Sequence, residues 1–412
     1  MNDYELAKHA KRAIAECRRI AAMSEEPGRI TRRFLTPPVR DVQALLRGRM
    51  ESLGMTVHTD AAGNLRGLWQ APSSRGARLV LGSHIDTVPD AGAFDGVLGV
   101  VLGLEWVELA QESGLSLPIE VIAFSEEEGV RFGVPFLGSR AVGGRFDQAL
   151  FKLKDAGGVT LEEAIRDFGL DPARIGEAAL DVNAIGFVEI HIEQGPVLEA
   201  EGLSVAAVTA IVGQTRVALK FSGQANHAGT TPMHLRRDAL ATAAEWISAV
   251  EALALRTDGL VATVGKVAVE PNVANVIPGV AAVSLDLRHT EDAARKSADD
   301  SLLAQAEAIA HRRGLTVQCT RQMDQPAVPM DERLTAIMAA AIESAGLPVK
   351  SMPSGAGHDA MVMAARVPTA MLFLRSPGGI SHHPDESVLE EDVAAALRVG
   401  CEFLKRLAVE VR

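Results

Sequence analysis

The stretch Arg78-Leu-Val-Leu-Gly-Ser83 is a short apolar run, and Ile119-Glu-Val-Ile-Ala-Phe124 is a second run of the same kind. Both are brief and bounded by Gly, Ser or Pro, which is typical of buried strands. Between them, residues 96–111 carry Val and Leu side chains at near-helical spacing. A strand–helix–strand order predicts parallel pairing with a right-handed crossover. The sequence therefore predicts an α/β core sheet.

Two later segments extend this pattern. Thr369-Ala-Met-Leu-Phe-Leu374 predicts a third buried strand, and the segment after residue 390 carries its apolar side chains on one stripe of a helix. That stripe consists of Val393, Leu397, Cys401, Leu404 and Val411. We expect a terminal helix packed on a mixed, mainly parallel sheet that is flanked by helices.

The middle of the chain has a different order of elements, β-α-β-β-α-β. Its strand-like segments are residues 211–221, 260–270, 280–289 and 315–320, and its long Ala-rich helical stretches are residues 235–255 and 291–313. This order is the split arrangement of a ferredoxin-like α+β domain. Because the α/β pattern resumes after Met330, we expect residues 211–325 to be inserted into a first domain made of residues 1–210 and 326–412.

Composition and charge narrow the class of protein. The 412 residues hold 41 Lys and Arg against 53 Asp and Glu, and this net charge of −12 disfavours nucleic acid as a partner because phosphate binding needs a basic face. Three widely spaced cysteines argue against a disulfide framework and for a reducing compartment. No window approaches the roughly 18 apolar residues of a membrane-spanning helix, and the mixed charges of residues 1–18 argue against a secretion signal. We expect a cytoplasmic protein that binds neither nucleic acid nor a membrane.

Polar side chains follow the first predicted strand. His84 and Asp86 are two positions apart, so both can leave the same edge of the sheet. A carboxylate is a usual partner of a metal-bound imidazole, and Asp95, just before the predicted helix, could turn towards a metal ion at the strand ends. The alternative is a satisfied polar pair with Asp95 as a helix N-cap. This segment alone leaves both interpretations open.

The next strands end in further polar groups. Glu126-Glu-Glu128 follows the second strand, and adjacent carboxylates repel one another unless solvent or cations neutralise them. One glutamate could bind a metal ion while its neighbour acts as a general base. His191 ends another apolar strand, and His382 and His383 follow the last one. A lone histidine there would more often be structural, but four such strand ends in one sheet favour a common metal site.

Seven motifs of the chain carry further information about its class. They are, in order, Ser83-His-Ile-Asp86, Asp95-Gly96, Glu126-Glu-Glu-Gly-Val-Arg-Phe132, His191-Ile-Glu-Gln-Gly195, Asn226-His-Ala-Gly-Thr-Thr-Pro232, Gly355-Ala-Gly-His-Asp359 and Ser381-His-His-Pro384. Together these motifs resemble those of the binuclear M20-type metallohydrolases. Within that family the chain is similar to the amidase branch of N-carbamoyl-L-amino acid hydrolases, allantoate amidohydrolases, ureidoglycolate amidohydrolases and yeast-type β-ureidopropionase. The motifs span nearly the whole chain and are far more specific for the family than for the substrate.

The resemblance implies a zinc-peptidase-like catalytic domain with two divalent metal ions. The ligands implied for one ion are His84, Asp95 and His191, and those for the other are Asp95, Glu128 and His382, with Asp95 bridging. His382 is preferred to His383 because the family motif has its ligand before a variable residue and a proline. These ligands suit Zn²⁺ or Mn²⁺ first, then Co²⁺ or Ni²⁺.

The resemblance also implies catalytic roles. Glu127 would be the general base towards a bridging water, and Asp86 would orient His84. The inserted domain would form a homodimer in which His227 reaches the partner's site and stabilises the oxyanion. The alternative for His227 is an exposed turn histidine.

Gln194, Asn275 and Arg288 match the substrate binders of the family, and Asn275, like His227, could act in the partner's site. The loop that contains Gly357 and His358 offers backbone amides and an imidazole, which suit the other end of the carboxylate or the ureido group. The alternative for His358 is a residue that only fixes this loop. A guanidinium can grip a substrate carboxylate through two parallel hydrogen bonds. Arg288 could instead pair internally with Asp286.

The implied reaction cleaves the ureido C–N bond of a small carboxylate and releases ammonia. Residues 28–37 and 60–67 look slightly more like the allantoate group than the rest of the branch. An N-carbamoyl-L-amino acid is the second candidate substrate and a ureidoglycolate-type compound the third. A peptidase of the same superfamily is a further possibility for the activity. A non-catalytic binding module would be expected to lack at least one ligand.

Overall fold

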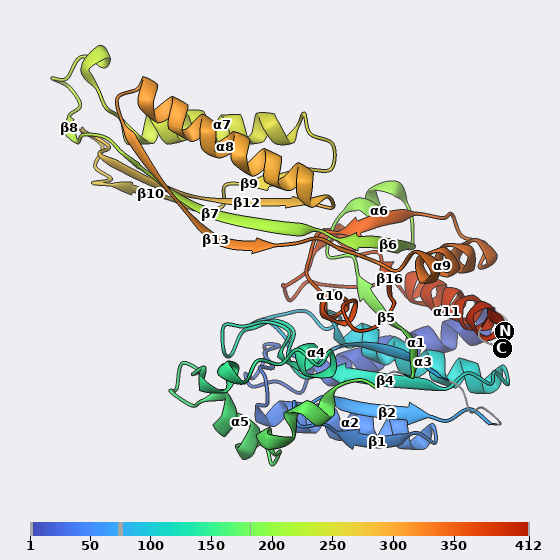
Figure 1. The fold of residues 1–412 in the computed structure, drawn as a ribbon. Helices are drawn as coiled ribbons and strands as arrows, with labels where there is room; N and C mark the ends of the chain where they lie inside the picture. Colours follow the sequence, from blue (N-terminus) through green and yellow to red (C-terminus); the bar gives the residue numbers. More distant parts are fainter. Residues whose placement is uncertain (1–2, 73–76, 182, 411–412) are drawn as a thin grey trace. The chain divides into compact units, whose positions relative to one another are not determined.

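The computed structural model describes residues 3–72, 77–181 and 183–410. The chain divides into two compact units (Figure 1). Unit 1 consists of Met1–Thr209 and Met330–Arg412, and unit 2 of Ala210–Pro329. Unit 2 is thus an insertion within the sequence of unit 1.

The main sheet has the strand order β1-β2-β4-β3-β5-β16-β6-β14, and β15 also pairs with β6. The four central strands, β4, β3, β5 and β16, run parallel, whereas the pairs on either side of them are antiparallel. The strands are β1 (Thr56–Thr59), β2 (Leu65–Trp69), β3 (Arg78–His84), β4 (Ile119–Phe124), β5 (Ala184–Ile192), β6 (Val205–Ile211), β14 (Val328–Pro329), β15 (Ser351–Ser354) and β16 (Thr369–Leu374). The predicted mixed sheet is confirmed, with its parallel pairing in the centre.

Helices cover the main sheet. They are α1 (Asp3–Ala21), α2 (Pro37–Ser52), α3 (Val97–Glu112), α4 (Leu137–Val142), α5 (Leu161–Asp167), α6 (Val197–Glu201), α9 (Glu332–Ser344), α10 (Asp359–Met363) and α11 (Glu390–Glu410), with 3-10 turns at Gln148–Lys152, Pro172–Ala178 and Pro377–Gly379. Because α3 is apolar nearly all round, it is buried against β3, β4 and β5. The predicted terminal helix is α11, which packs on β16, α1, α3 and α9. Val411 of its predicted stripe lies outside the described residues.

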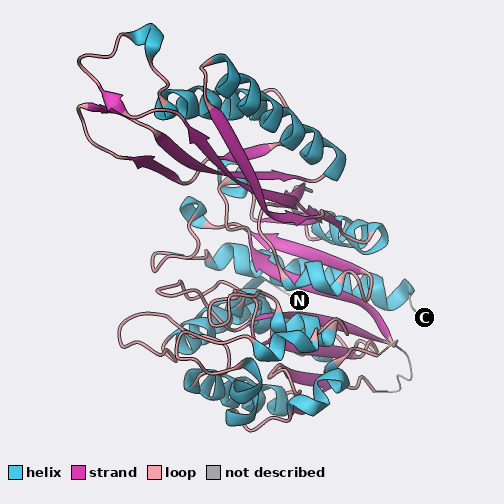
Figure 2. Ribbon diagram, turned by 60° about the vertical axis from the view of Figure 1, so that its left-hand side comes forward, coloured by secondary structure: helices cyan, strands magenta, loops and turns pink. Residues whose placement is uncertain are grey.

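Unit 2 has an antiparallel sheet in the order β10-β12-β7-β13, and β9 also pairs with β12. Its strands are β7 (Gly213–Ser222), β9 (Val261–Thr263), β10 (Val267–Glu270), β12 (Val280–His289) and β13 (Thr316–Gln325), and β8 (Asn226–His227) and β11 (Val276–Ile277) form a separate pair. The helices α7 (Ala239–Ala254) and α8 (Asp292–Arg312) lie side by side on one face of the sheet (Figure 2). This order confirms the predicted ferredoxin-like arrangement.

The helices of unit 2 lie on one face because buried and more exposed residues alternate along β7 and β12. Phe221 of β7 packs against Trp246 of α7, and the indole N–H of Trp246 donates to the backbone oxygen of Leu302 in α8 at 2.9 Å. The two helices and the sheet therefore enclose one apolar core.

The expectation of a continuous strand over residues 260–270 is wrong. Thr263 of β9 pairs with Asp286, and Val267 of β10 pairs with Val283, so residues 264–266 face only residues 284–285 of β12. One extra residue on one strand is a β-bulge, and here it lies around Gly265. The bulge divides the predicted strand into β9 and β10.

The first long helix of unit 2 begins later than the predicted residue 235. Met233–Leu235 forms a 3-10 turn, and α7 starts at Ala239. Asp238 is its N-cap and accepts the backbone N–H of Ala241 at 2.9 Å. The cap residue decides where the helix starts.

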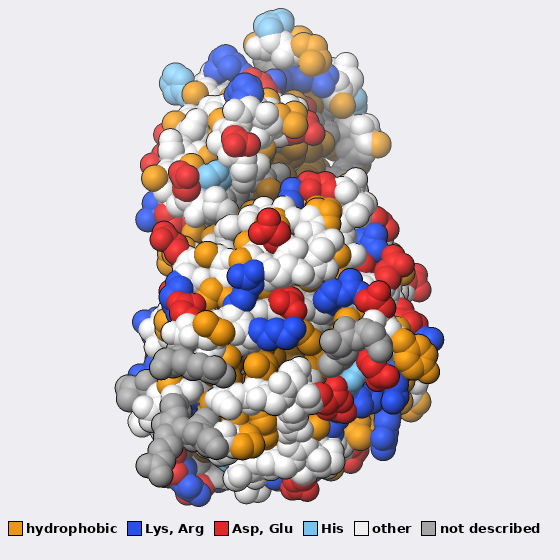
Figure 3. Space-filling model, turned by 90° about the vertical axis from the view of Figure 1, so that its right-hand side faces the viewer, with side chains coloured by type: hydrophobic (Ala, Val, Ile, Leu, Met, Phe, Trp, Pro, Cys, Tyr) orange, Lys and Arg blue, Asp and Glu red, His pale blue; other side chains and the backbone are white. Residues whose placement is uncertain are grey.

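Cys17, Cys319 and Cys401 are free thiols. Among the helices in the described ranges, none combines the length and the apolarity that crossing a bilayer requires. Acidic and basic side chains are intermixed over the face that Figure 3 draws.

Candidate metal centre

His84, Asp95 and His191 meet at the carboxyl ends of two neighbouring parallel strands. His84 is the last residue of β3, and His191 lies near the end of β5. Asp95 lies just before α3. The N-cap residue of this helix is Gly96, and no side chain caps its first turn. The Asp95 Oδ1 atom lies 3.6 Å from His84 Nε2 and 3.2 Å from His191 Nε2. The N-cap alternative for Asp95 is therefore wrong.

The second oxygen of Asp95 faces a different pair of residues. Asp95 Oδ2 lies 3.2 Å from His382 Nε2, which is 3.6 Å from Glu128 Oε1. His383 is 58% exposed and lies beside Asp385, outside the cluster. The five predicted ligand residues thus form two groups that share Asp95: His84, Asp95 and His191, and Asp95, Glu128 and His382.

Hydrogen bonds on the far ring nitrogens orient two of the imidazoles. His84 Nδ1 lies 3.0 Å from the backbone oxygen of Asp86, and His191 Nδ1 lies 2.9 Å from the backbone oxygen of Ile192. A carbonyl oxygen only accepts, so each Nδ1 carries a proton, and the Nε2 atom that faces Asp95 is the ring nitrogen left to bind a metal ion. A metal-bound histidine typically donates its other ring N–H in this way.

The cluster contains buried polar atoms that have no hydrogen-bond partner among the described residues. Two of them, His191 Nε2 and Asp95 Oδ1, face each other. Buried polar atoms are ordinarily satisfied, and a cation between a ring lone pair and a carboxylate oxygen would satisfy both. Imidazole and carboxylate ligands without a thiolate suit Zn²⁺, Mn²⁺, Co²⁺ or Ni²⁺. The residues present therefore fit the metal ions that the motifs imply.

Asp86 fixes the acidic segment after β4. Its carboxylate accepts the backbone N–H of Glu127 at 2.9 Å and that of Glu128 at 3.1 Å, and one of its oxygens lies 3.4 Å from His84 Nδ1. Glu126 instead accepts the backbone N–H of Gly129. The ligand atoms of His84, Glu127 and Glu128 lie within 4.8 Å of one another. Asp86 thus holds two of the three glutamates beside the cluster.

Several carboxylates lie close together in the buried metal centre. Burial raises the pKa of Glu127 well above its usual range, and burial together with the charge of Asp95 raises the pKa of Glu128 to about 7. Burial would also raise the pKa of Asp95, but its contacts with His191, His382 and His84 outweigh it and lower this pKa. Carboxylates whose pKa values are pushed apart are typical of acid–base sites.

Gln194 joins the cluster from the segment after β5. Its Nε2 donates to Asp95 Oδ2 at 3.1 Å and to Ser381 Oγ at 3.0 Å, and it lies 3.4 Å from His382 Nε2. This predicted substrate binder thus contacts two of the ligand residues.

His358 lies behind His191. The two ring centroids are 4.4 Å apart, and His358 Nε2 lies 2.9 Å from Ser354 Oγ. Burial lowers the pKa of His358 well below its usual range, so the ring is neutral. A Cβ atom at the neighbouring Gly357 would lie 3.0 Å from the ring of Phe136. Both predicted binders therefore belong to a tightly packed segment of unit 1.

The remaining predicted site residues lie in unit 2. His227 is exposed on β8, and the backbone N–H of Gly229 donates to its Nδ1 at 3.0 Å. The neutral ring consequently carries its proton on Nε2, which is then a hydrogen-bond donor. The backbone oxygen of Asn275 accepts the N–H of Ala228 at 2.9 Å. His227 and Asn275 are thus brought to the same end of the β8–β11 pair.

Arg288 lies on β12 and contacts a carboxylate of the same strand. Its Nε donates to Asp286 Oδ1 at 2.9 Å, while Arg216 of β7 donates to Asp286 Oδ2 at 2.9 Å. The internal pairing with Asp286 is therefore present, and two arginines share this one carboxylate.

Ser381 and Glu386 belong to the cluster but were not among the predicted site residues. Glu386 is buried and accepts backbone N–H groups 291 and 292 positions away in the sequence. No local pattern signals such a contact.

The chain is similar to several characterised proteins. A sequence model of Peptidase family M20/M25/M40 matches residues 80–406. The N-carbamoyl-L-amino acid amidohydrolase of Geobacillus stearothermophilus is 40% identical over 92% of this chain and 92% of that protein. The allantoate amidohydrolase of Escherichia coli (strain K12) is 36% identical over 97% of this chain and 98% of that protein. The crystal structure of an amidase of the hydantoinase/carbamoylase family from Burkholderia multivorans matches with a TM-score of 0.91 and 33% identity, covering 96% of this chain and 97% of that one.

Proposed function

Since the chain belongs to Peptidase family M20/M25/M40, in its hydantoinase/carbamoylase branch, we propose that it cleaves a ureido C–N bond of a small carboxylate and releases ammonia. It is an amidohydrolase that acts on C–N bonds other than peptide bonds. The observation that carries the proposal is the division of the Asp95 carboxylate: one oxygen faces His84 and His191, and the other faces His382.

We propose that these two groups hold two divalent metal ions. His84, Asp95 and His191 would bind one ion, and Asp95, Glu128 and His382 the other. Ions bound there would supply Lewis-acid polarisation of the ureido carbonyl and lower the pKa of a water molecule. The unsatisfied atoms His191 Nε2 and Asp95 Oδ1 support this assignment.

Glu127 is the general base of the proposed reaction. Its backbone is held by Asp86, and its carboxylate lies within 4.8 Å of the ligand atoms of His84 and Glu128. It takes a proton from the attacking water and returns it to the leaving nitrogen, which departs as ammonia. The carbamate that remains loses CO₂.

We further propose that the protein acts as a homodimer assembled through unit 2. In the described part of the chain, β9 and β10 pair with β12 alone, and Val261 and Val267 on them are 59% and 52% exposed. An exposed strand edge of this kind is a template for pairing with another chain. The Nε2–H of His227 suits donation to an oxyanion in the partner's site, and Arg288 suits a substrate carboxylate.

Allantoate is our first candidate substrate and an N-carbamoyl-L-amino acid the second. The allantoate amidohydrolase of Escherichia coli covers slightly more of both chains, which favours the first candidate. The higher identity of the Geobacillus stearothermophilus enzyme favours the second.

A panel of ammonia-release assays tests the proposal. The purified chain, loaded with Zn²⁺ or Mn²⁺, is given allantoate, N-carbamoyl-L-amino acids, ureidoglycolate and a dipeptide. We expect ammonia from the ureido carboxylates, with the highest kcat/KM for allantoate, and no cleavage of the dipeptide. A higher kcat/KM for an N-carbamoyl-L-amino acid would establish the second candidate. Metal-loaded protein that releases no ammonia from any of them would refute the function.

A further inference from the structure

Glu386 is a buried carboxylate that joins two loops of the metal centre. The residue is 5% exposed and lies four positions after His382. Its Oε1 accepts the backbone N–H groups of Phe94 at 2.9 Å and Asp95 at 3.0 Å, and its Oε2 accepts the hydroxyl of Ser381 at 3.1 Å. A single side chain therefore binds the backbone of Asp95 and the residue that precedes His382.

His382 needs such support because its backbone conformation is unfavourable. Its φ angle is 55°, in the left-handed region that non-glycine residues rarely adopt. A residue held there is strained and persists only where the surroundings impose it. The His382 side chain is 49% exposed, so packing restrains it on one side only.

Glu386 restrains the chain on both sides of His382. Its side chain accepts from Ser381 just before the histidine, and its backbone N–H donates to the oxygen of His383, just after it, at 3.0 Å. Ser381 also accepts the amide of Gln194, which donates to Asp95 as well. The loop that carries His382 is thus tied to the loop that carries Asp95 through Glu386.

The Asp95 loop is shaped around the same side chain. A Cβ atom at Gly92 would lie 2.3 Å from the Cβ of Glu386, so the glycine leaves the space that Glu386 occupies. Both partners of the carboxylate Oε1 are backbone N–H groups. Glu386 therefore fixes the backbone of Asp95, independently of the contacts that the Asp95 side chain makes.

We propose that Glu386 is a positioning residue, which sets the separation of Asp95 and His382 so that both can bind the second metal ion. This inference rests on the proposed function, because it assumes that the two residues share an ion. Groups that hydrogen-bond to metal ligands typically contribute 10–100-fold to metal affinity.

Zinc affinity measures this contribution directly. The full-length protein is stripped of metal and titrated with Zn²⁺ against a chromophoric chelator, as wild type, Glu386→Ala and Glu386→Gln. We expect Glu386→Ala to weaken the second Zn²⁺ by about 10–100-fold. Glu386→Gln should stay close to wild type, because its amide oxygen still accepts both N–H groups and its amide nitrogen can donate to Ser381.

Asp155→Ala is the matched control. One oxygen of Asp155 accepts the N–H groups of Gly157 and Val159, and the other accepts from Arg131, so it makes the same kind of contacts, and none of these three partners is a ligand residue. Its zinc affinity should equal that of wild type, even if its thermal stability falls as much as that of Glu386→Ala.

The outcomes separate this inference from the proposed function. Wild-type affinity for both ions in Glu386→Ala overturns the inference. An equal loss of zinc affinity in Glu386→Gln also overturns it, because the loss would then come from the removed charge and not from the removed hydrogen bonds. Should Glu386→Ala fail to fold, Ser381→Ala replaces it: weaker zinc binding supports the inference, and unchanged binding overturns it. A wild-type protein that binds no zinc or releases no ammonia overturns the proposed function itself.

Discussion

The imidazole of His84 fills the space that a side chain at residue 96 would need. A Cβ atom on Gly96 would lie 2.4 Å from His84 Nε2, and the φ angle of Gly96 is +66°. Both facts favour glycine at this position, because the close approach leaves no room for a Cβ atom and side chains rarely adopt the left-handed backbone. The Asp95-Gly96 pair therefore provides a carboxylate and, next to it, the room for the histidine that faces it.

Gly96→Ala should lower ammonia release by at least about tenfold, because the new methyl group displaces His84 and metal-ligand geometry tolerates little movement. Gly103→Ala in the same helix is the control. Its nearest neighbour would lie 3.4 Å from the new Cβ, an ordinary contact, so activity should be unchanged. Steady-state rates and zinc content check both variants. Full activity in Gly96→Ala would show that His84 can move without loss.

Glu127→Gln should keep both metal ions and lose turnover by about 10²–10⁴-fold, because the amide cannot accept the proton of the attacking water. Glu128→Gln should instead lower the metal content. The pair is a matched test, since Asp86 holds the backbone N–H of both glutamates. Metal analysis and single-turnover ammonia release distinguish them. Unchanged turnover in Glu127→Gln contradicts its role as the base.

His227→Ala and Glu127→Gln chains, each inactive alone, should regain part of the activity when mixed. In a mixed dimer, the His227→Ala chain contributes an intact Glu127, and its partner contributes an intact His227. The control mixes His227→Ala with the double variant His227→Ala/Glu127→Gln, which offers no intact His227. Recovery of ammonia release after verified subunit exchange is the measurement. Exchange without recovery rules out a shared site.

Arg288→Ala should raise KM for carboxylate substrates by at least about tenfold, the loss expected for a hydrogen bond to a charged group. Arg216→Ala is the control, since Arg216 shares Asp286 with Arg288 and is 46% exposed. A substrate analogue with an amide in place of the carboxylate should show equal KM for wild type and Arg288→Ala. A normal KM with every carboxylate would remove Arg288 from substrate binding.

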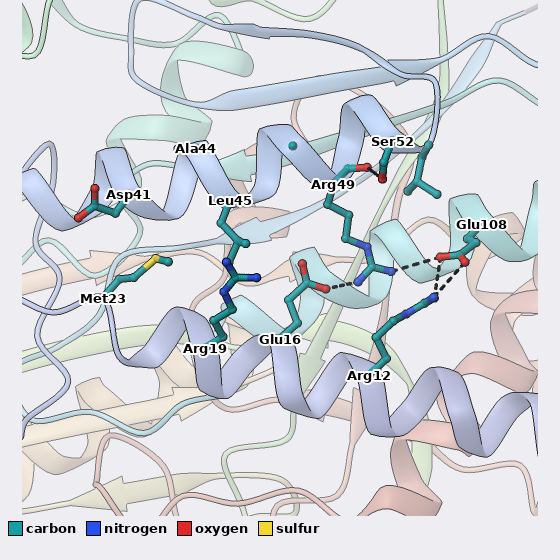
Figure 4. Close-up of a pocket in the computed structure, with 12 residues that line it drawn as sticks. Arg12, Glu16, Arg19, Met23, Asp41, Ala44, Leu45, Arg49, Ser52 and Glu108 are labelled. Atoms are coloured by element: carbon teal, nitrogen blue, oxygen red, sulfur yellow. Dashed lines mark hydrogen bonds and ion pairs between the residues drawn. The ribbon is translucent and has the colours of Figure 1, made fainter.

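A charge network far from the centre makes stability depend on pH. Glu105 of α3 is fully buried and binds His9 at 2.6 Å, Arg12 at 3.0 Å and Arg49 at 2.7 Å. Burial alone would raise the pKa of Glu105, but these partners outweigh it and lower the pKa to about 2. Figure 4 shows the neighbouring pocket, where Arg12 and Arg49 also bind Glu108, and Arg49 also binds Glu16.

A lowered pKa means that the stability from Glu105 is complete above its unfolded value of 4.5 and is lost as the pH falls from there to about 2. Glu105→Gln should therefore be less stable than wild type by a few kcal/mol at pH 7, and the difference should shrink on acidification. Thermal unfolding between about pH 7 and 3 measures this. The control Glu162→Gln removes an exposed pair with Arg166 and should have little effect. A difference independent of pH would contradict the linkage.

Much of the fold can be predicted because the decisive signals are local. The run Arg78–His84 and the apolar helix after Gly96 are contiguous in sequence, and their order alone implies parallel strands. The break between β9 and β10 is different, since a bulge depends on how residues 264–266 meet a partner strand. The start of α7 at Ala239 did have a local signal in Asp238, a good N-cap residue.

The candidate site divides in the same way. His84 and His191 lie at the ends of strands and Glu128 follows one. Strand ends in a parallel sheet lie at one edge, so the meeting of these residues can be expected from order alone. The role of Glu386 could not be predicted in this way. Its partners are the backbone N–H groups of Phe94 and Asp95, which are distant in sequence, and backbone groups leave no pattern in the sequence. The strained backbone of His382 is likewise invisible in the sequence, since only a small minority of histidines adopt a positive φ.

The chain leaves unit 1 after Thr209 and re-enters it at Met330, and these two residues are joined by a hydrogen bond from the N–H of Met330 to the oxygen of Thr209 at 2.9 Å. A tight turn could bridge so short a gap at little entropic cost. All five ligand candidates lie outside Ala210–Pro329, the stretch that such a turn would replace. A polypeptide without this stretch would therefore keep every candidate metal-binding side chain and lose His227 and Arg288. It would allow metal binding to be studied apart from turnover.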